Sequence, residues 1–261
     1  MNYNQCYLSE IYSAIQGEGP FVGVRQLFIR FCACDLRCVW CDTPDSLIRT
    51  EFCNVENASG ARIFQKIKNP IQLKALDEII SKFSHERKMH HSISLTGGEP
   101  LLQYKFLSLF LPILKEKYKS PIYLESGGHR PNELKDIVNY LDYVSMDFKL
   151  PSSAQAGVFW DEHEQFLEIS LSAKNVKSAW VKIVLTRDTL FDELLKSIDI
   201  IKSVCKNGKK VELFLQPVSK IEGENSTPPS EIDLLNTQSK LLELYPYVRV
   251  VPQVHKLIGQ K

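Results

Sequence analysis

Three cysteines lie close together in the sequence Cys34-Asp35-Leu36-Arg37-Cys38-Val39-Trp40-Cys41, with the spacing C-x3-C-x2-C. Thiolates at this spacing can wrap one face of a cubane iron–sulfur cluster, which usually takes four cysteine ligands. Three cysteines would leave one iron without a protein ligand, and an open metal position can bind a substrate or cofactor. The spacing therefore predicts a four-iron four-sulfur cluster with one open iron.

A zinc knuckle and simple hydrophobic packing are the two alternatives for these cysteines. A zinc knuckle would need a fourth ligand, and no histidine lies nearby in the sequence. Buried cysteines also pack as small hydrophobic residues. We assign that ordinary role to the cysteines without partners at a useful spacing, namely Cys6, Cys32, Cys53 and Cys205.

A second candidate segment is Thr96-Gly97-Gly98-Glu99-Pro100, which follows a predicted strand. The two glycines allow a close approach of the backbone to a bound group, and they tolerate positive φ angles. Pro100 suits the first position of a helix. We expect a bulky residue at Gly98 to exclude a cofactor sterically and to leave the iron content near normal. An ordinary strand-to-helix turn is the alternative.

The composition sets limits on the class of protein. The chain has 261 residues, with 32 Lys plus Arg and 31 Asp plus Glu. This near balance gives no reason to expect a nucleic-acid or membrane partner. The polar N-terminus does not resemble a secretory signal, and charged residues interrupt every apolar run. We expect a cytoplasmic protein with a single domain over residues 1–261.

Short β-rich runs alternate with stretches of helical spacing along most of the chain. The predicted strands are 26–31, 92–96, 121–126, 143–148, 180–186, 211–217 and 248–254, and the predicted helices include 102–117, 132–141, 189–205 and 230–244. Such alternation predicts parallel strands joined by right-handed crossovers. The pattern fits an incomplete barrel or an open doubly wound sheet. In either fold, ligands bind beyond the C-terminal ends of the strands.

Residues 44–72 do not follow this alternation, because they combine mixed charges with Asn-Ala-Ser-Gly and Asn-Pro. We predict an irregular insertion there with one short helix, and we assign it no chemistry.

The cysteine motif after the first strand and the Gly-Gly-Glu-Pro segment after the second resemble the radical S-adenosylmethionine superfamily. Of the two folds, we therefore expect an α/β incomplete TIM-like barrel of parallel strands, with the cluster loop after the first core strand. The resemblance implies that S-adenosylmethionine chelates the open iron through its amino and carboxylate groups. One electron from the reduced cluster then breaks a C–S bond and releases a 5′-deoxyadenosyl radical.

Further motifs span almost the whole chain. They are Ile15-Gln16-Gly17-Glu18-Gly19-Pro20, Trp40-Cys41-Asp42-Thr43, Lys149-Leu150-Pro151, Gln216-Pro217-Val218 and Pro252-Gln253-Val254-His255-Lys256. Together they resemble the 7-carboxy-7-deazaguanine synthase family. That resemblance implies conversion of 6-carboxy-5,6,7,8-tetrahydropterin to 7-carboxy-7-deazaguanine with release of ammonia, in 7-deazapurine and queuosine biosynthesis.

The same resemblance implies roles for individual residues. Arg30 would pair with the substrate carboxylate through its planar guanidinium, and Thr43 would supply an oxygen to Mg²⁺. The remaining substrate contacts would be Ile15, Gln16, Gly17, Thr96 and the terminal carboxylate of Lys261. The cluster ligands would be Cys34, Cys38 and Cys41, and the cofactor contacts would be Trp40, Cys41, Asp42, Gly98, Asp147, Phe148, Lys149, Gln216 and Pro217. A homodimer and an electron donor such as a flavodoxin or ferredoxin are typical of the family.

This chain departs from the family pattern at three places. Asp35 stands where the family usually has asparagine, and it adds a negative charge that would lower the cluster potential. Asp147-Phe148-Lys149 aligns with a Ser-Pro-Lys segment, so Lys149 keeps its place while the residue at Asp147 differs. Glu125-Ser126-Gly127-Gly128 replaces a Glu-Thr-Asn-Gly segment.

Three rival functions would share part of this pattern. A glycyl-radical-enzyme activase has the same cluster and cofactor but acts on a protein, and it would not need Gln16, Glu18 and Thr43 together. A non-catalytic iron–sulfur protein would hold a cluster without cleaving S-adenosylmethionine. A zinc-stabilised binding module would be colourless after anaerobic purification.

Overall fold

A computed structural model describes residues 3–84, 89–205, 209–219 and 226–260. One sheet of ten strands forms the centre of the molecule. Seven of these strands are parallel neighbours, each hydrogen-bonded to the next. In spatial order they are β3 (Arg25–Phe31), β7 (Ser92–Gly97), β8 (Ile122–Ser126), β9 (Tyr143–Asp147), β10 (Ser178–Leu185), β11 (Leu213–Pro217) and β12 (Val248–Val250). All seven predicted strands are thus confirmed.

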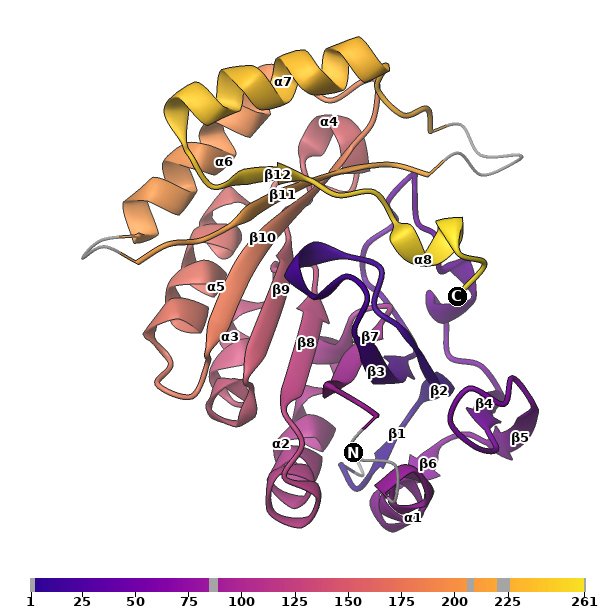
Figure 1. The fold of residues 1–261 in the computed structure, drawn as a ribbon. Helices are drawn as coiled ribbons and strands as arrows, with labels where there is room; N and C mark the ends of the chain where they lie inside the picture. Colours follow the sequence, from indigo (N-terminus) through magenta and orange to yellow (C-terminus); the bar gives the residue numbers. More distant parts are fainter. Residues whose placement is uncertain (1–2, 85–88, 206–208, 220–225, 261) are drawn as a thin grey trace.

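The spatial order of these strands equals their order in the sequence, which decides between the two predicted folds. A doubly wound sheet reverses its strand order at a switch point. Right-handed crossovers without a reversal place every helix on the same face of the sheet. Figure 1 shows this arrangement for the helices α2 (Tyr104–Ile113), α3 (Pro131–Lys135), α5 (Trp160–Ser172), α6 (Phe191–Val204) and α7 (Glu231–Leu244). The sheet has edge strands and does not close, so the fold is a partial barrel.

The other end of the sheet contains strands that were not predicted from the sequence. β2 (Leu8–Ile15) runs antiparallel to β3. β4 (Phe52–Glu56) is parallel to β2 and forms a hairpin with β5 (Phe64–Lys68). A separate pair joins β1 (Gln5–Cys6) to β6 (Ile71–Gln72).

The irregular insertion predicted at 44–72 is therefore wrong from residue 52 onward, because β4, β5 and β6 all fall within 52–72. Residues 44–51 hold a 3₁₀ turn, Pro44–Ser46, and otherwise follow the irregular path that was predicted. β5 lies at the edge of the sheet with exposed Gln and Lys side chains, so its composition resembles that of a loop.

The helices differ from the predictions mainly at their ends. The predicted helix 132–141 divides into α3 and a 3₁₀ turn at Val138–Tyr140. The predicted helix 102–117 begins with the 3₁₀ turn Pro100–Gln103 and ends in a π-helical turn, Leu114–Tyr118. α1 (Leu73–Ser84) precedes β7, and α4 (Pro151–Ala154) follows β9.

The last predicted strand, 248–254, ends at Val250. Pro252 lacks the N–H that a further ladder bond would need. The chain then turns into the short helix α8 (Val254–Leu257), which lies near the β2 end of the sheet in Figure 1.

Apolar side chains fill the space between the sheet and its helices, including Ile29, Leu95, Leu124 and Phe166, all of which are fully buried. The described helices are all too short or too polar to cross a bilayer.

Candidate functional site

A cavity of about 720 Å³ opens at the C-terminal ends of the parallel strands. Such volumes are typical of small-molecule and cofactor sites. The cavity brings together most of the residues predicted from the sequence: Ile15, Gln16, Gly17, Arg30, Cys34, Cys38, Trp40, Cys41, Asp42, Thr43, Thr96, Gly98, Asp147, Lys149 and Gln216. Phe148 and Pro217 do not line it, and Lys261 lies outside the described residues.

The three motif cysteines line this cavity together and form no disulfide. Each is partly exposed, whereas Cys6, Cys32 and Cys53 are fully buried in the core. Burial raises the pKa of the Cys34 thiol to about 11, and it also raises the pKa of Cys38. Iron binding would therefore release protons from these thiols. Three free thiols facing one cavity fit the predicted cluster.

The two glycines after β7 allow this strand end to pack tightly against the cluster loop. Gly97 has φ +130°, and a Cβ atom there would lie 2.2 Å from the carbonyl oxygen of Phe31. A Cβ atom on Gly98 would lie 2.1 Å from the carbonyl oxygen of Ala33, which itself has φ 75°. A larger residue at Gly98 would therefore displace the cluster loop itself. This geometry contradicts our expectation that such a residue would act on the cofactor alone.

Glu99 is buried and connects two of the loops at this edge. Its Oε1 atom accepts the Leu101 amide at the start of the 3₁₀ turn. Its Oε2 atom accepts the Gly127 amide at 2.9 Å, and the Ser126 hydroxyl donates to both oxygens. The carboxylate thus holds the loop after β8 against the segment after β7.

Gln16, Thr96 and Glu125 form a hydrogen-bonded set on the wall of the cavity. The Gln16 amide donates to Glu125 at 2.8 Å and to Gln26 at 2.9 Å. The Thr96 hydroxyl donates to the other oxygen of Glu125 at 2.6 Å. Glu125 had no role predicted from the sequence, although it stands where a strand meets a glycine pair.

Arg30 lies in β3, and its side chain lines the cavity near the same wall. Its Nη2 atom donates to the Tyr12 hydroxyl at 2.6 Å, and its Nε atom lies 3.5 Å from a Glu10 oxygen. Both partners belong to β2, which pairs with β3. Burial opposes the charge of Arg30, but Tyr12 and Glu10 raise its pKa. The guanidinium is therefore a fixed cation beside the cavity.

Glu18 is a second residue without a role predicted from the sequence. It lies 2.6 Å from the Lys182 ammonium and accepts the side-chain amides of Gln216 and Gln253, both at 3.0 Å. Burial alone would raise the pKa of Glu18, yet the adjacent Lys182 outweighs burial and lowers the pKa to about 2. Glu18 is therefore ionised at neutral pH.

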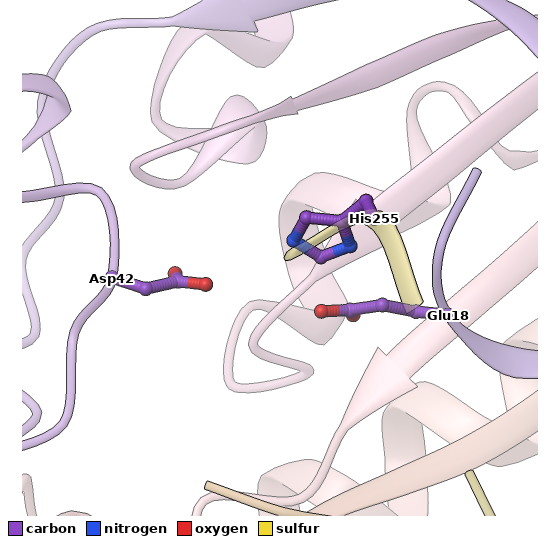
Figure 2. A group of neighbouring side chains, drawn as sticks. All are labelled: Glu18, Asp42 and His255. Carbon is purple, nitrogen blue, oxygen red and sulfur yellow. The ribbon is translucent and has the colours of Figure 1, made fainter. Parts of the chain in front are cut away.

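Glu18, Asp42 and His255 converge on one point from three separate segments (Figure 2). Their candidate ligand atoms all lie within 4.8 Å of one another. Each carboxylate already has an ammonium partner, since Lys256 lies 3.2 Å from Asp42 and Lys182 lies against Glu18. The arrangement therefore presents a polar charged wall with no vacant cation site formed in advance.

The C-terminal segment brings His255 to this point. The Val254 amide donates to the Gly17 carbonyl at 3.0 Å, and His255, Lys256 and Gln260 line the cavity. The C-terminal segment thus packs against the site, and it places the side chains of His255 and Lys256 on the cavity wall.

Asp147, Lys149 and Trp40 meet on the side of the cavity formed by β9. Lys149 pairs with Asp147 at 2.8 Å and lies 4.4 Å from the centre of the Trp40 ring, a cation–π contact. Burial opposes the charge of Lys149, but Asp147 raises its pKa. Phe148 points to a different partner, because its ring stacks on His163 at 4.5 Å in the buried core.

Thr43 lies next to the cysteine motif, with its hydroxyl oxygen 4.0 Å from the Cys41 sulfur. It lines the cavity beside Asp42. Hydroxyl and carboxylate oxygens suit a hard cation such as Mg²⁺. The carboxylates of Glu18 and Asp42 already pair with Lys182 and Lys256. Such an ion would therefore need further oxygens from a bound ligand.

Known proteins of similar sequence point to the same chemistry as the geometry. The sequence model of the "Radical SAM superfamily" matches residues 28–218. The 7-carboxy-7-deazaguanine synthase of Geobacter sulfurreducens is 36% identical over 254 residues, covering 97% of both chains. The synthase of Archaeoglobus fulgidus is 31% identical over 260 residues, again covering 97% of both chains.

Solved structures agree on the fold. The crystal structure of QueE from Escherichia coli has a TM-score of 0.60 and 19% identity, covering 95% of this chain and 94% of that one. SuiB from Streptococcus suis, solved with S-adenosylmethionine, has a TM-score of 0.54 and 15% identity, covering 84% of this chain and 48% of that one. With the three cysteines and the glycine-rich strand end in one cavity, this chain belongs to the 7-carboxy-7-deazaguanine synthase family of the radical SAM superfamily.

Proposed function

We propose that this chain converts 6-carboxy-5,6,7,8-tetrahydropterin to 7-carboxy-7-deazaguanine with release of ammonia, as a radical S-adenosylmethionine lyase. One observation carries the proposal: the three cluster cysteines share a cavity with Gln16, Arg30 and Thr96. Its volume of about 720 Å³ lies within the range for small-molecule and cofactor sites.

Arg30 and the Gln16–Glu125–Thr96 set would hold the pterin. The Arg30 guanidinium suits a planar carboxylate, which it can meet with two parallel N–H donors. Glu125 fixes the positions of the Gln16 amide and the Thr96 hydroxyl before any substrate arrives. A ring contraction needs the substrate in one orientation, and side chains held in this way reduce the entropy lost on binding. Ile15 and Gly17 would complete this side.

The cluster and S-adenosylmethionine would lie on the other side of the cavity, held by Cys34, Cys38 and Cys41. When bound, this pair supplies the 5′-deoxyadenosyl radical that starts the reaction. Trp40, Asp42, Gly98, Asp147, Lys149 and Gln216 line the cavity there and would contact the cofactor. Lys149 stacks on Trp40, which fixes the ring position. Phe148 and Pro217 would act from behind this wall, supporting it without lining the cavity.

Mg²⁺ would bind at Thr43 together with substrate oxygens. The hydroxyl supplies one hard ligand, and the paired lysines on Glu18 and Asp42 disfavour a site built from protein carboxylates alone. The role of the ion would be to orient the substrate.

A reductant must supply the electron, and a flavodoxin or ferredoxin would serve. We further infer a cytoplasmic homodimer of single-domain chains, without nucleic-acid or membrane partners.

A covered small-molecule cavity favours this function over a glycyl-radical-enzyme activase. The C-terminal segment places His255 and Lys256 on the cavity wall, which leaves less room for a protein loop.

The proposal is tested with anaerobically reconstituted protein, which should carry about four irons per chain. Replacement of Cys34, Cys38 or Cys41 by Ala should abolish cleavage of S-adenosylmethionine. The buried Cys53→Ala and the distant Cys205→Ala serve as controls and should keep both the cluster and the cleavage activity. Loss of the cluster in Cys53→Ala with retention in Cys34→Ala would overturn the ligand assignment.

A further inference from the structure

Asp35 lies in the cluster loop between Cys34 and Cys38, and its carboxylate has two partners. Its Oδ2 atom lies 2.7 Å from Arg130 Nη2, and its Oδ1 atom lies 2.9 Å from His129 Nε2. Both partners belong to the loop after β8, more than 90 residues away in the sequence. We name this contact of Asp35 with His129 and Arg130 the loop clasp.

Each side of the loop clasp is itself anchored. Arg130 lies just before α3 and also contacts Glu133 in the first turn of that helix, at 2.6 Å. The His129 side chain is 5% exposed, and its ring lies tilted against that of Phe159, with 5.3 Å between the ring centres. Its Nδ1 atom lies 4.0 Å from Glu99 Oε2. The loop clasp therefore connects the cluster loop to the helix layer and to the segment after β7.

The backbone of the cluster loop is also hydrogen-bonded to other segments, including a bond of 3.1 Å from the Val39 amide to the Ala154 carbonyl. Glu99 donates its amide to the Ala33 carbonyl at 2.8 Å, and the Cys34 amide donates to Leu47 at 3.3 Å. Arg37 donates to carbonyls within the cluster loop itself, those of Cys34 and Leu36. The contacts of Asp35 tie this loop to the loop after β8.

The geometry points to two effects of the loop clasp on the cluster, an inference that builds on the proposed function. It holds the cysteine loop in a fixed position against the loop after β8. It also places a cation against the carboxylate next to Cys34, so that Asp35 does not lower the cluster potential as an unpaired charge would. Asp35, His129 and Arg130 are positioning residues, because they act through the loop and not on the substrate.

The effect of charge and the effect of holding the loop predict different results for the same variants: the first changes the reduction potential of the cluster, and the second changes its rate of iron loss. Arg130→Gln leaves the Asp35 charge without its strongest partner and should lower the reduction potential of the cluster. Asp35→Asn removes the negative charge, leaves the cation, and should raise the potential. The double variant removes both charges and should return near the wild-type value. Each shift should be on the order of tenfold in the equilibrium constant for reduction, which is about 59 mV for one electron.

The test is an anaerobic redox titration of the reconstituted protein, followed by electron paramagnetic resonance of the reduced cluster. Iron loss to a chelator is measured in parallel and should be faster in both single variants, because each removes one charge from the loop clasp and weakens the tie. Glu133→Gln is the matched control, since it removes a charge on Arg130's other side and leaves Asp35 paired; it should move the potential less than Arg130→Gln.

Shifts of the same sign in Asp35→Asn and Arg130→Gln would overturn the charge effect. Wild-type rates of iron loss in both Asp35→Asn and Arg130→Gln would show that the loop clasp does not hold the cluster loop. A wild-type chain that takes up no cluster would overturn the proposed function itself, which distinguishes that failure from the failure of the loop clasp.

Discussion

The Gln16 amide donates a hydrogen bond of 2.8 Å to the Glu125 carboxylate, although 109 residues separate the two in the sequence. Gln16 directly follows β2, and Glu125 lies in β8. The second oxygen of Glu125 accepts the Thr96 hydroxyl. One carboxylate therefore sets the orientation of two side chains that we assign to the substrate.

This relationship predicts the effect of Glu125→Gln. The new amide group cannot accept at both positions, so either Gln16 or Thr96 loses its acceptor. A buried group left without a partner costs about 1–3 kcal/mol. We expect kcat/KM for the pterin to fall about ten- to a hundred-fold, with normal iron content and normal cofactor cleavage in the absence of pterin. A variant with the wild-type kcat/KM for the pterin would show that Glu125 does not position the substrate.

Arg30→Ala should separate radical formation from product formation. Loss of a charge-assisted bond to the substrate carboxylate costs about 1.5–3 kcal/mol, which is about ten- to a hundred-fold in affinity. The variant should keep its cluster and form 5′-deoxyadenosine with much less 7-carboxy-7-deazaguanine. Tyr12→Phe is the control, because it removes only a partner of Arg30 and should cost less. Equal losses in the two variants would count against a direct contact with the substrate.

Thr43→Ala tests the metal. If its hydroxyl is a ligand of Mg²⁺, turnover should fall and the Mg²⁺ concentration needed for half-maximal rate should rise. Wild-type turnover should also fall when Mg²⁺ is chelated. Ser46→Ala, in the following 3₁₀ turn, removes a hydroxyl that bonds the Thr43 carbonyl and serves as the control. Product formation by Thr43→Ala at the wild-type rate, with unchanged Mg²⁺ dependence, would remove the metal role alone.

His163 predicts how stability changes with pH. Burial lowers its pKa to about 3, and its Nε2 atom lies 3.2 Å from the Gly127 carbonyl. Because the unfolded chain binds this proton from about pH 6.5 downward, stability should fall as the pH decreases from that value towards 3, by at most about 1.4 kcal/mol per pH unit. His163→Gln should flatten this part of the profile. The check is anaerobic urea unfolding of both proteins from pH 7.5 to pH 5, where parallel slopes would refute the assignment.

The parallel strands could be predicted from the sequence because each is a short run of apolar and β-branched residues, a pattern that favours a strand over a helix. SISLT and WVKIVLT, for example, become β7 and β10 with small changes at their ends. β4 and β5 could not be predicted in this way. Lys66 and Lys68 are exposed on β5, and the strand exists through its pairing with β4.

The site was predictable where its chemistry follows from spacing or from motifs. The cysteine triplet and Gly97-Gly98 belong to this group. Glu18 and Glu125 were missed because their roles depend on partners distant in the sequence, such as Lys182 at 164 residues from Glu18. The contact of the C-terminal segment with Gly17 likewise arises only when the chain folds.

The central claim is tested most directly by identifying the product of the wild-type protein. Reconstituted enzyme is incubated anaerobically with the pterin, S-adenosylmethionine, Mg²⁺ and a reductant, and the mixture is analysed by mass spectrometry and for ammonia. We predict 7-carboxy-7-deazaguanine, with ammonia released in equal amount. Cleavage of S-adenosylmethionine without any consumption of the pterin would contradict the proposed reaction, even though the radical SAM fold would stand.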